Sequence, residues 1–177
     1  PLFLVGLALL FAKEHHRYNA YLGAIALTVF ISFMGYFLVP ARSPYYAAQM
    51  PEFADLFRFT VPVRGNAIGE WLAHALDAAE TIKVDCFPSG HTAGGVLVLL
   101  MTWKWRRRIF WMVLPVAASL IFATVYLRYH YVTDLVAGAM LAAASFRTAI
   151  FLNDRLARVA EADVPLTRPR PGRQEVR

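Results

Sequence analysis

The chain has 177 residues, of which 58% are hydrophobic and 17% charged, and its formal net charge is +6. Soluble domains carry about a quarter charged residues, so this composition excludes an ordinary soluble domain and favours a membrane protein of one domain. The single cysteine, Cys86, excludes an internal disulfide and cannot form a metal cluster by itself.

The first forty residues predict two apolar segments separated by a polar turn. Residues 1–12 are apolar but short, and the chain starts with Pro1 rather than methionine, so we expect them to end a spanning helix whose beginning is missing. Residues 13–18 form the turn. Residues 19–39 supply about twenty mostly apolar positions, enough to cross a bilayer core of about 30 Å, and Pro40 ends that helix.

A long polar-to-mixed region, residues 40–88, comes next and is expected outside the cytoplasm. Within it, residues 67–79 repeat apolar side chains at helical spacing, with Glu70, His74 and Asp77 at the other positions. This pattern predicts an amphipathic helix that lies at the interface or caps the bundle.

The remaining chain predicts three further spans, residues 92–103, 109–126 and 132–152. The tail, residues 153–177, is rich in Arg and Pro and is expected to be disordered and cytoplasmic. The fold prediction is therefore an all-α, polytopic transmembrane helix bundle within residues 1–152.

Basic residues predict the orientation of this bundle. Thirteen of the 18 Lys and Arg residues fall in the 13–18 turn, in the 104–108 loop or from Arg147 onward. If these regions share one side, that side is the cytoplasm. An anion-binding role is expected for several of the other five, which are Arg42, Arg58, Arg64, Lys83 and Arg128.

Two stretches carry the residues of chemical interest. The first, Cys86–Thr92, reads Cys-Phe-Pro-Ser-Gly-His-Thr and predicts a helix start, because Pro88 and Ser89 are typical of helix N-termini. A helix N-terminus presents unpaired N–H groups and a partial positive charge, which suit a phosphate.

The second stretch, Tyr126–Asp134, places His130 and Asp134 four residues apart, which predicts one helix face. There a carboxylate can hold the tautomer and orientation of an imidazole. The span that begins at His91 turns at the 104–108 loop and returns to His130, so both histidines are expected at the same side. Ser89–Trp105 is about 17 residues, or roughly 25 Å, and so short a span draws its first residues toward headgroup level.

These motifs resemble signatures of the type-2 phosphatidic acid phosphatase superfamily over about residues 34–152. Pro88–His91 is similar to the second signature, and Val125–Leu127 with His130, Asp134 and Ala137–Gly138 is similar to the third. The resemblance implies a six-helix membrane bundle without metal or other cofactor, in the plasma or inner membrane. Its implied partners are the lipid bilayer and a lipid phosphate or phospholipid, with no nucleic acid.

The resemblance also implies the role of each residue. His130 would attack phosphorus and become a phosphohistidine, and Asp134 would orient it. His91 would donate a proton to the leaving alcohol, while Ser89 and Gly90 would hold phosphoryl oxygens.

Two departures from the family pattern concern arginine. The arginine usual six residues before the histidine is replaced by Thr124, and we predict that Arg128, on the same helix face, substitutes for it. The usual first motif is absent, and Arg42, between two prolines, is the expected phosphate clamp. Lys83 could reach the same phosphate, although a surface role is equally consistent with its position.

Three other functions are considered. The sequences of the motifs are similar to those of the inositol phosphorylceramide synthase branch of the family. That branch transfers a phospho-headgroup from one lipid to an acceptor alcohol. A proton-coupled transporter could use His91, His130 and Asp134 as a relay, but such residues are expected near mid-span rather than at span ends. A bis-histidine haem protein is a further alternative, which visible absorbance would test.

Overall fold

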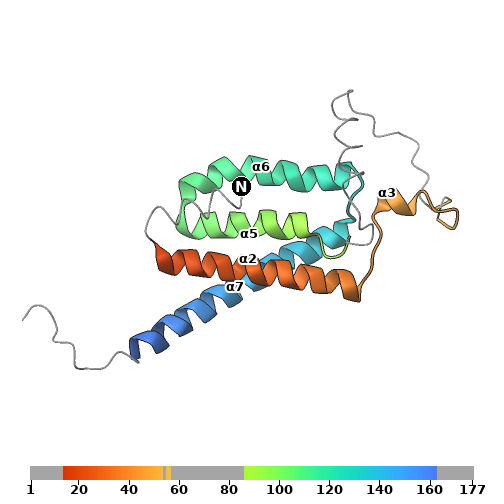
Figure 1. Ribbon diagram of the computed structural model, residues 1–177. Coiled ribbons are helices and arrows are strands. Elements are labelled where there is room, and N and C mark those ends of the chain that lie inside the picture. The colour runs from red at the N-terminus through yellow and green to blue at the C-terminus, as the bar shows by residue number, and fades with distance from the viewer. Residues whose placement is uncertain (1–13, 54, 57–85, 163–177) are drawn as a thin grey trace, which may run out of the picture.

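The structure is a computed structural model that describes residues 14–53, 55–56 and 86–162. The apolar segment 1–12, the predicted helix 67–79 and Lys83 lie outside the described residues. Four long helices and one short helix make up the described part (Figure 1): α2 (His15–Leu38), α3 (Pro44–Ala47), α5 (Gly90–Trp105), α6 (Arg107–Tyr126) and α7 (Val132–Ala162).

Helix α5 is the centre of the described bundle. It packs against α2, α6 and α7, and α2 also packs against α7. Figure 1 shows α5 between α6 and α2. Helix α7 crosses behind α2 and extends beyond the end at which α2 begins. Leu97, Val98 and Met101 of α5 are each 1% exposed or less, so the central helix supplies the large buried side chains.

Helices α2 and α7 pack against α5 and against each other through small residues. Every fourth residue along one face of α2 is small and buried, and the inner face of α7 follows a similar rule. Small side chains let helix backbones approach closely, which is how helices associate in membranes, where lipid is as apolar as leucine. The residues concerned are Ala20, Ala24, Thr28 and Ser32 of α2, with Ala142, Ser145 and Ala149 of α7.

Large apolar side chains cover the outside of the bundle. Phe37 is 79% exposed and Met112 is 74% exposed, which suits a surface that faces lipid. Within the described residues, α2, α6 and α7 are long and apolar enough to cross a membrane. Helix α5 has 16 residues, about 24 Å at 1.5 Å per residue, so the helix is as short as the sequence predicts. The prediction of an all-α transmembrane bundle is confirmed.

Helix α2 begins earlier than the sequence pattern predicts. The residues assigned to a polar turn are helical from His15, because Glu14 forms ion pairs with Arg17 at 3.0 Å and with Arg106 at 2.9 Å. The Glu14–Arg106 pair also joins the start of α2 to the turn between α5 and α6. These polar residues extend the apolar helix rather than terminate it.

Helix α7 ends later than predicted. It continues ten residues past Leu152 to Ala162, so the first part of the tail expected to be disordered is helical. His16 accounts for part of this extension, since it contacts Asp154 at 3.0 Å and its carbonyl accepts a hydrogen bond from the Asn153 amide at 3.0 Å. The start of α2, the turn between α5 and α6 and the distal part of α7 therefore lie at one end of the described bundle.

Candidate active site

The two motifs meet at the opposite end of the bundle, where α5 and α7 begin and α6 ends (Figure 1). The backbone N–H of Ser89 donates to the carbonyl of Asp134 at 3.1 Å, which ties the start of α5 to that of α7. The rings of His91 and His130 then lie side by side, with centroids 5.9 Å apart. The structure thus brings together both histidines that the sequence separates by 39 positions.

The predicted helix start in the first motif is confirmed. Ser89 is the N-cap of α5, and its Oγ accepts a hydrogen bond from the Thr92 N–H at 3.3 Å. This bond uses one acceptor site of a fully buried hydroxyl, and the hydroxyl donates to no other group among the described residues. A hydroxyl donor is the group that a phosphoryl oxygen needs. A Cβ on Gly90 would lie 2.8 Å from the hydroxyl oxygen of Tyr36, so a larger residue would disturb this helix start.

The turn from α6 to α7 differs from the sequence prediction. Arg128 does not continue the helix, because α6 ends at Tyr126 and Arg128 has a φ of 62°. The N–H of Arg128 donates to Val125 and that of Tyr129 to Thr124, both at 2.9 Å. These two bonds form a Schellman motif, in which the left-handed position normally belongs to glycine. Arg128 is therefore in a turn rather than on the helix face expected.

His130 and Asp134 also do not share a helix, since α7 begins at Val132. Asp134 lies in its first turn, where its Oδ2 accepts the backbone N–H of Tyr131 at 2.8 Å. This is the carboxylate half of a capping box, and a negative charge there also complements the helix dipole. The turn, and not helical spacing, therefore brings His130 toward Asp134.

The environment of His130 defines its tautomer. Its Nδ1 lies 3.0 Å from the carbonyl oxygen of Cys86, and a carbonyl only accepts, so Nδ1 carries the proton. Asp134 Oδ2 is 3.7 Å from the same nitrogen, too long for a hydrogen bond but close enough to form an ion pair when the ring is charged. His130 is 8% exposed. With the proton on Nδ1, the lone pair of the neutral ring is on Nε2.

Cys86 is the residue of this site that sequence reasoning missed. Its Sγ donates to Asp134 Oδ2 at 2.9 Å and lies 3.3 Å from the carbonyl oxygen of Tyr129. Its N–H donates to the carbonyl of Ala41 at 3.2 Å. The sequence feature that could have indicated Cys86 is its position two residues before Pro88. No spacing rule, however, links a cysteine at that position to a histidine 44 residues later.

The chain segment around Arg42 and the backbone of Arg128 are joined to the two motifs by hydrogen bonds. Residue 41 pairs with Cys86, and the N–H of Tyr45 donates to the carbonyl of Arg128 at 3.1 Å, so the segment that carries Arg42 joins both motifs. The Arg42 guanidinium is exposed and donates to Met50 Sδ at 2.9 Å. Both arginines therefore belong to the motif end of the bundle.

Burial raises the pKa of Tyr131 above its ordinary value of 10.0, and Cys86 and Asp134 add to the rise. A phenol next to these groups stays neutral over the physiological range. Tyr131 therefore adds no charge next to the Asp134 carboxylate.

A model of the PAP2 superfamily matches residues 1–148, which covers both motifs, all of α5 and α6 and the first half of α7. Comparison with curated proteins and with solved structures found no match. A match over most of the chain, together with the membrane-type helical bundle, shows the family that the motifs predict. The chain belongs to the PAP2 superfamily, and it is accordingly a membrane protein of the phosphatase or phosphotransferase type.

Proposed function

We propose that the protein removes a phosphoryl group from a lipid phosphate through a phosphohistidine on His130, without a metal ion. The observation that carries this proposal is the arrangement of the two histidines. His130 has its proton on Nδ1, facing the Cys86 carbonyl, and its ring lies 5.9 Å from that of His91. This arrangement supports Nε2 of His130 as the nucleophile and the nearby imidazole of His91 as the proton donor to the leaving group.

In the first half-reaction, Nε2 of His130 attacks phosphorus and the bond from phosphorus to the lipid oxygen breaks. His91 donates a proton to that oxygen, which leaves as the free alcohol. The imidazole becomes cationic, and the Asp134 carboxylate at 3.7 Å stabilises this charge, as does the Cys86 carbonyl that accepts its Nδ1–H. Asp134 also orients the ring by holding the turn before α7.

In the second half-reaction, water attacks the phosphohistidine, and neutral His91 takes the proton from that water. The bond from Nε2 to phosphorus breaks, and inorganic phosphate leaves. The equatorial oxygens are held by the first N–H groups of α5, at Gly90 and His91, and by the hydroxyl of Ser89. Arg128 and Arg42 supply positive charge, and Lys83 is a further candidate.

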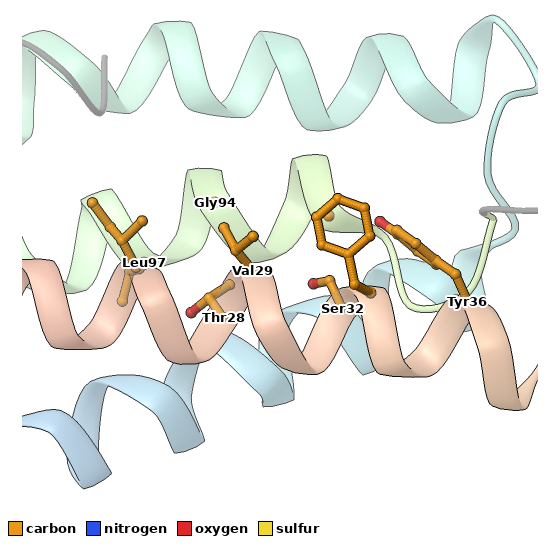
Figure 2. A pocket seen from close by; sticks show the side chains of 9 residues that line it. Thr28, Val29, Ser32, Tyr36, Gly94 and Leu97 are labelled. Atoms are coloured by element: carbon orange, nitrogen blue, oxygen red, sulfur yellow. The ribbon is translucent and has the colours of Figure 1, made fainter. Parts of the chain in front are cut away.

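A groove between α2 and α5 supports a lipid as the substrate. Its volume is about 170 Å³, and it runs along the two helices from Leu97 to Gly90, the first residue of α5 (Figure 2). The lining is apolar except for a few hydroxyls, and the buried Oγ of Ser32 has no hydrogen-bond partner among the described residues. The groove is lined by Ile25, Thr28, Val29, Ser32, Phe33, Tyr36, Gly90, Gly94 and Leu97.

An acyl chain in this groove would lie parallel to the helices, with its phosphate at the Gly90 end. Figure 2 shows Tyr36 at that end and Leu97 at the other. The Ser32 hydroxyl could donate to an ester carbonyl of the lipid. The shortness of α5 supports a site at headgroup depth, and the basic residues of the other end support a site that faces away from the cytoplasm, in the plasma or inner membrane.

The decisive experiment is intact-mass measurement of the protein after brief incubation with lipid phosphates and an alkaline denaturing quench, because phosphohistidine is acid-labile. The wild type should gain one phosphoryl group, localised to His130 by peptide mapping. His130→Ala should gain none, while His16→Ala, an exposed histidine at the far end, should gain the same group as wild type. Turnover with the label on another residue would refute the mechanism.

The same measurement tests a second candidate function, the transfer of a phospho-headgroup to an alcohol. The sequences of the two motifs favour this function. A heavier adduct on His130 would identify a transferase and give the mass of the group it carries. An adduct of one phosphoryl group, released as phosphate by water, would identify a phosphatase.

The groove is tested separately with Gly94→Leu, which fills it from the side of α5. We expect kcat/KM to fall for a long-chain phosphatidate and to change little for a water-soluble phosphomonoester. Ala118→Leu adds a similar volume on the exposed side of α6 and is the control. Equal losses for both substrates would contradict an acyl-chain site.

A further inference from the structure

Three metal-ligating side chains lie together at the base of the candidate active site. They are Cys86, His130 and Asp134, all buried, and each offers one donor atom. Cys86 Sγ lies 3.5 Å from His130 Nδ1 and 2.9 Å from Asp134 Oδ2, and the nitrogen and oxygen are 3.7 Å apart. His130 comes from the turn before α7, Asp134 from the first turn of α7, and Cys86 from the segment just before α5.

A tetrahedral zinc site has ligand–ligand separations of about 3.3 to 3.5 Å; the 3.5 and 3.7 Å separations here are close to this range, whereas the 2.9 Å between Cys86 Sγ and Asp134 Oδ2 is shorter. The equidistant point in the plane of the three atoms lies about 2 Å from each, and an ion slightly above that plane lies at the Zn–N, Zn–O and Zn–S bond lengths of about 2.0 to 2.3 Å. Thiolate, imidazole and carboxylate are also the three ligand types that zinc takes in proteins. A small outward movement of Sγ would bring all three atoms to bonding distance.

We propose that Cys86, His130 and Asp134 form an inhibitory site for a thiophilic divalent cation such as Zn²⁺ or Cd²⁺. Binding replaces the thiol proton of Cys86, which leaves to solvent, and the metal occupies the Nδ1 lone pair of His130. The one proton of the neutral imidazole then moves from Nδ1 to Nε2. No bond is oxidised or reduced, and one proton is released for each metal ion bound.

The inhibition follows from the tautomer. A metal on Nδ1 removes the hydrogen bond to the Cys86 carbonyl and leaves Nε2 protonated, so His130 has no lone pair for phosphorus. Mg²⁺ and Ca²⁺ prefer oxygen ligands and should not bind this set. The inhibitory consequence rests on the proposed function of His130, whereas the binding itself does not.

Binding can be measured without activity because Cys86 is the only cysteine of the chain. Titration of tag-free protein in detergent with Cd²⁺ should produce the ultraviolet charge-transfer band of a cadmium–thiolate bond, with one equivalent bound. Cys86→Ser should lack the band and bind at least about 100-fold more weakly, since loss of an outer partner of a metal site alone costs about 10- to 100-fold. His130→Ala should keep a weaker band.

The activity arm compares each variant with its own metal-free rate on a lipid phosphate. Zn²⁺ should inhibit the wild type reversibly, with recovery on chelation, and should inhibit Cys86→Ser at least about 100-fold less potently; Mg²⁺ should inhibit neither. Absence of the cadmium band at saturation would overturn the metal site. A band in a protein whose activity is unchanged at saturation would overturn the inhibition. A band in a protein with no phosphoryl-transfer activity would refute the proposed function alone and leave the metal site standing.

Discussion

The contact between α5 and α7 gives the sharpest test of how the site is assembled. Gly138 of α7 packs directly on the first turn of α5. A Cβ at this position would lie 2.5 Å from the carbonyl oxygen of Ser89, 3.2 Å from the Ala93 nitrogen and 3.2 Å from Thr92 Cβ. The atoms that it meets are mostly backbone, which cannot rotate away. Gly138→Ala must therefore push α5 and α7 apart.

The size of this effect follows from the distances. An ordinary contact begins at 3.4 Å, so the Ser89 carbonyl must move by about 0.9 Å relative to α7, which carries Asp134. The bond from the Ser89 N–H to the Asp134 carbonyl, now 3.1 Å, is lost by such a shift. Overpacking of this kind costs about 1–3 kcal/mol of stability. A misplacement of about 1 Å at a catalytic site lowers the rate by about 100-fold.

The assay is the initial rate of phosphate release from a lipid phosphate in detergent, measured together with the thermal midpoint. Gly95→Ala is the matched control, because its Cβ would meet Ile121 at an ordinary 3.6 Å and because alanine favours a helix. We expect kcat of Gly138→Ala to fall about 100-fold and its midpoint to drop, with neither change in Gly95→Ala. Rates within about threefold of each other for the two variants would refute the reasoning.

Three further predictions concern single residues. Arg128→Gly should leave the thermal midpoint unchanged or raise it, because glycine suits a φ of 62°. Its kcat/KM should fall about 10- to 100-fold, because a charged hydrogen bond to the substrate is lost. A lower midpoint or an unchanged kcat/KM would contradict this prediction. Asp154→Ala should change stability by less than about 1 kcal/mol in chemical denaturation, because its pair with His16 is exposed, and a larger loss would mean that the pair anchors α7. The stability that Tyr131 adds through its raised pKa should be present below pH 10.0 and should disappear as pH rises through the folded-state value; Tyr131→Phe should remove this alkaline step in a pH series of melting curves.

Local patterns in the sequence predict much of the fold because they act over a few residues. The apolar runs predict α2, α6 and α7 as membrane helices, and the Ser89 N-cap predicts the start of α5. The ends of the helices were less predictable. The start of α2 depends on Arg106, and the extension of α7 depends on His16, and both contacts join residues far apart in the chain.

The candidate site shows the same division. Its residues could be named from motifs, since the order Pro-Ser-Gly-His and a histidine four residues before an aspartate are visible in one dimension. Their relative positions could not be predicted from the sequence. His130 and Asp134 meet because of a Schellman turn in which Arg128 has a left-handed conformation, and no helical spacing predicts such a turn. The Gly138 contact with Ser89 is equally invisible in the sequence.

By itself, therefore, the sequence determined that this is a helical membrane protein with two histidine motifs at helix starts, because hydrophobic length and helix capping are local properties. Only the tertiary structure decided what surrounds the nucleophile. The backbone of Cys86 sets the tautomer of His130, and its thiol shares the Asp134 carboxylate. These contacts arise where the chain before α5 meets the turn before α7, and that meeting depends on how closely small residues allow the two helices to pack.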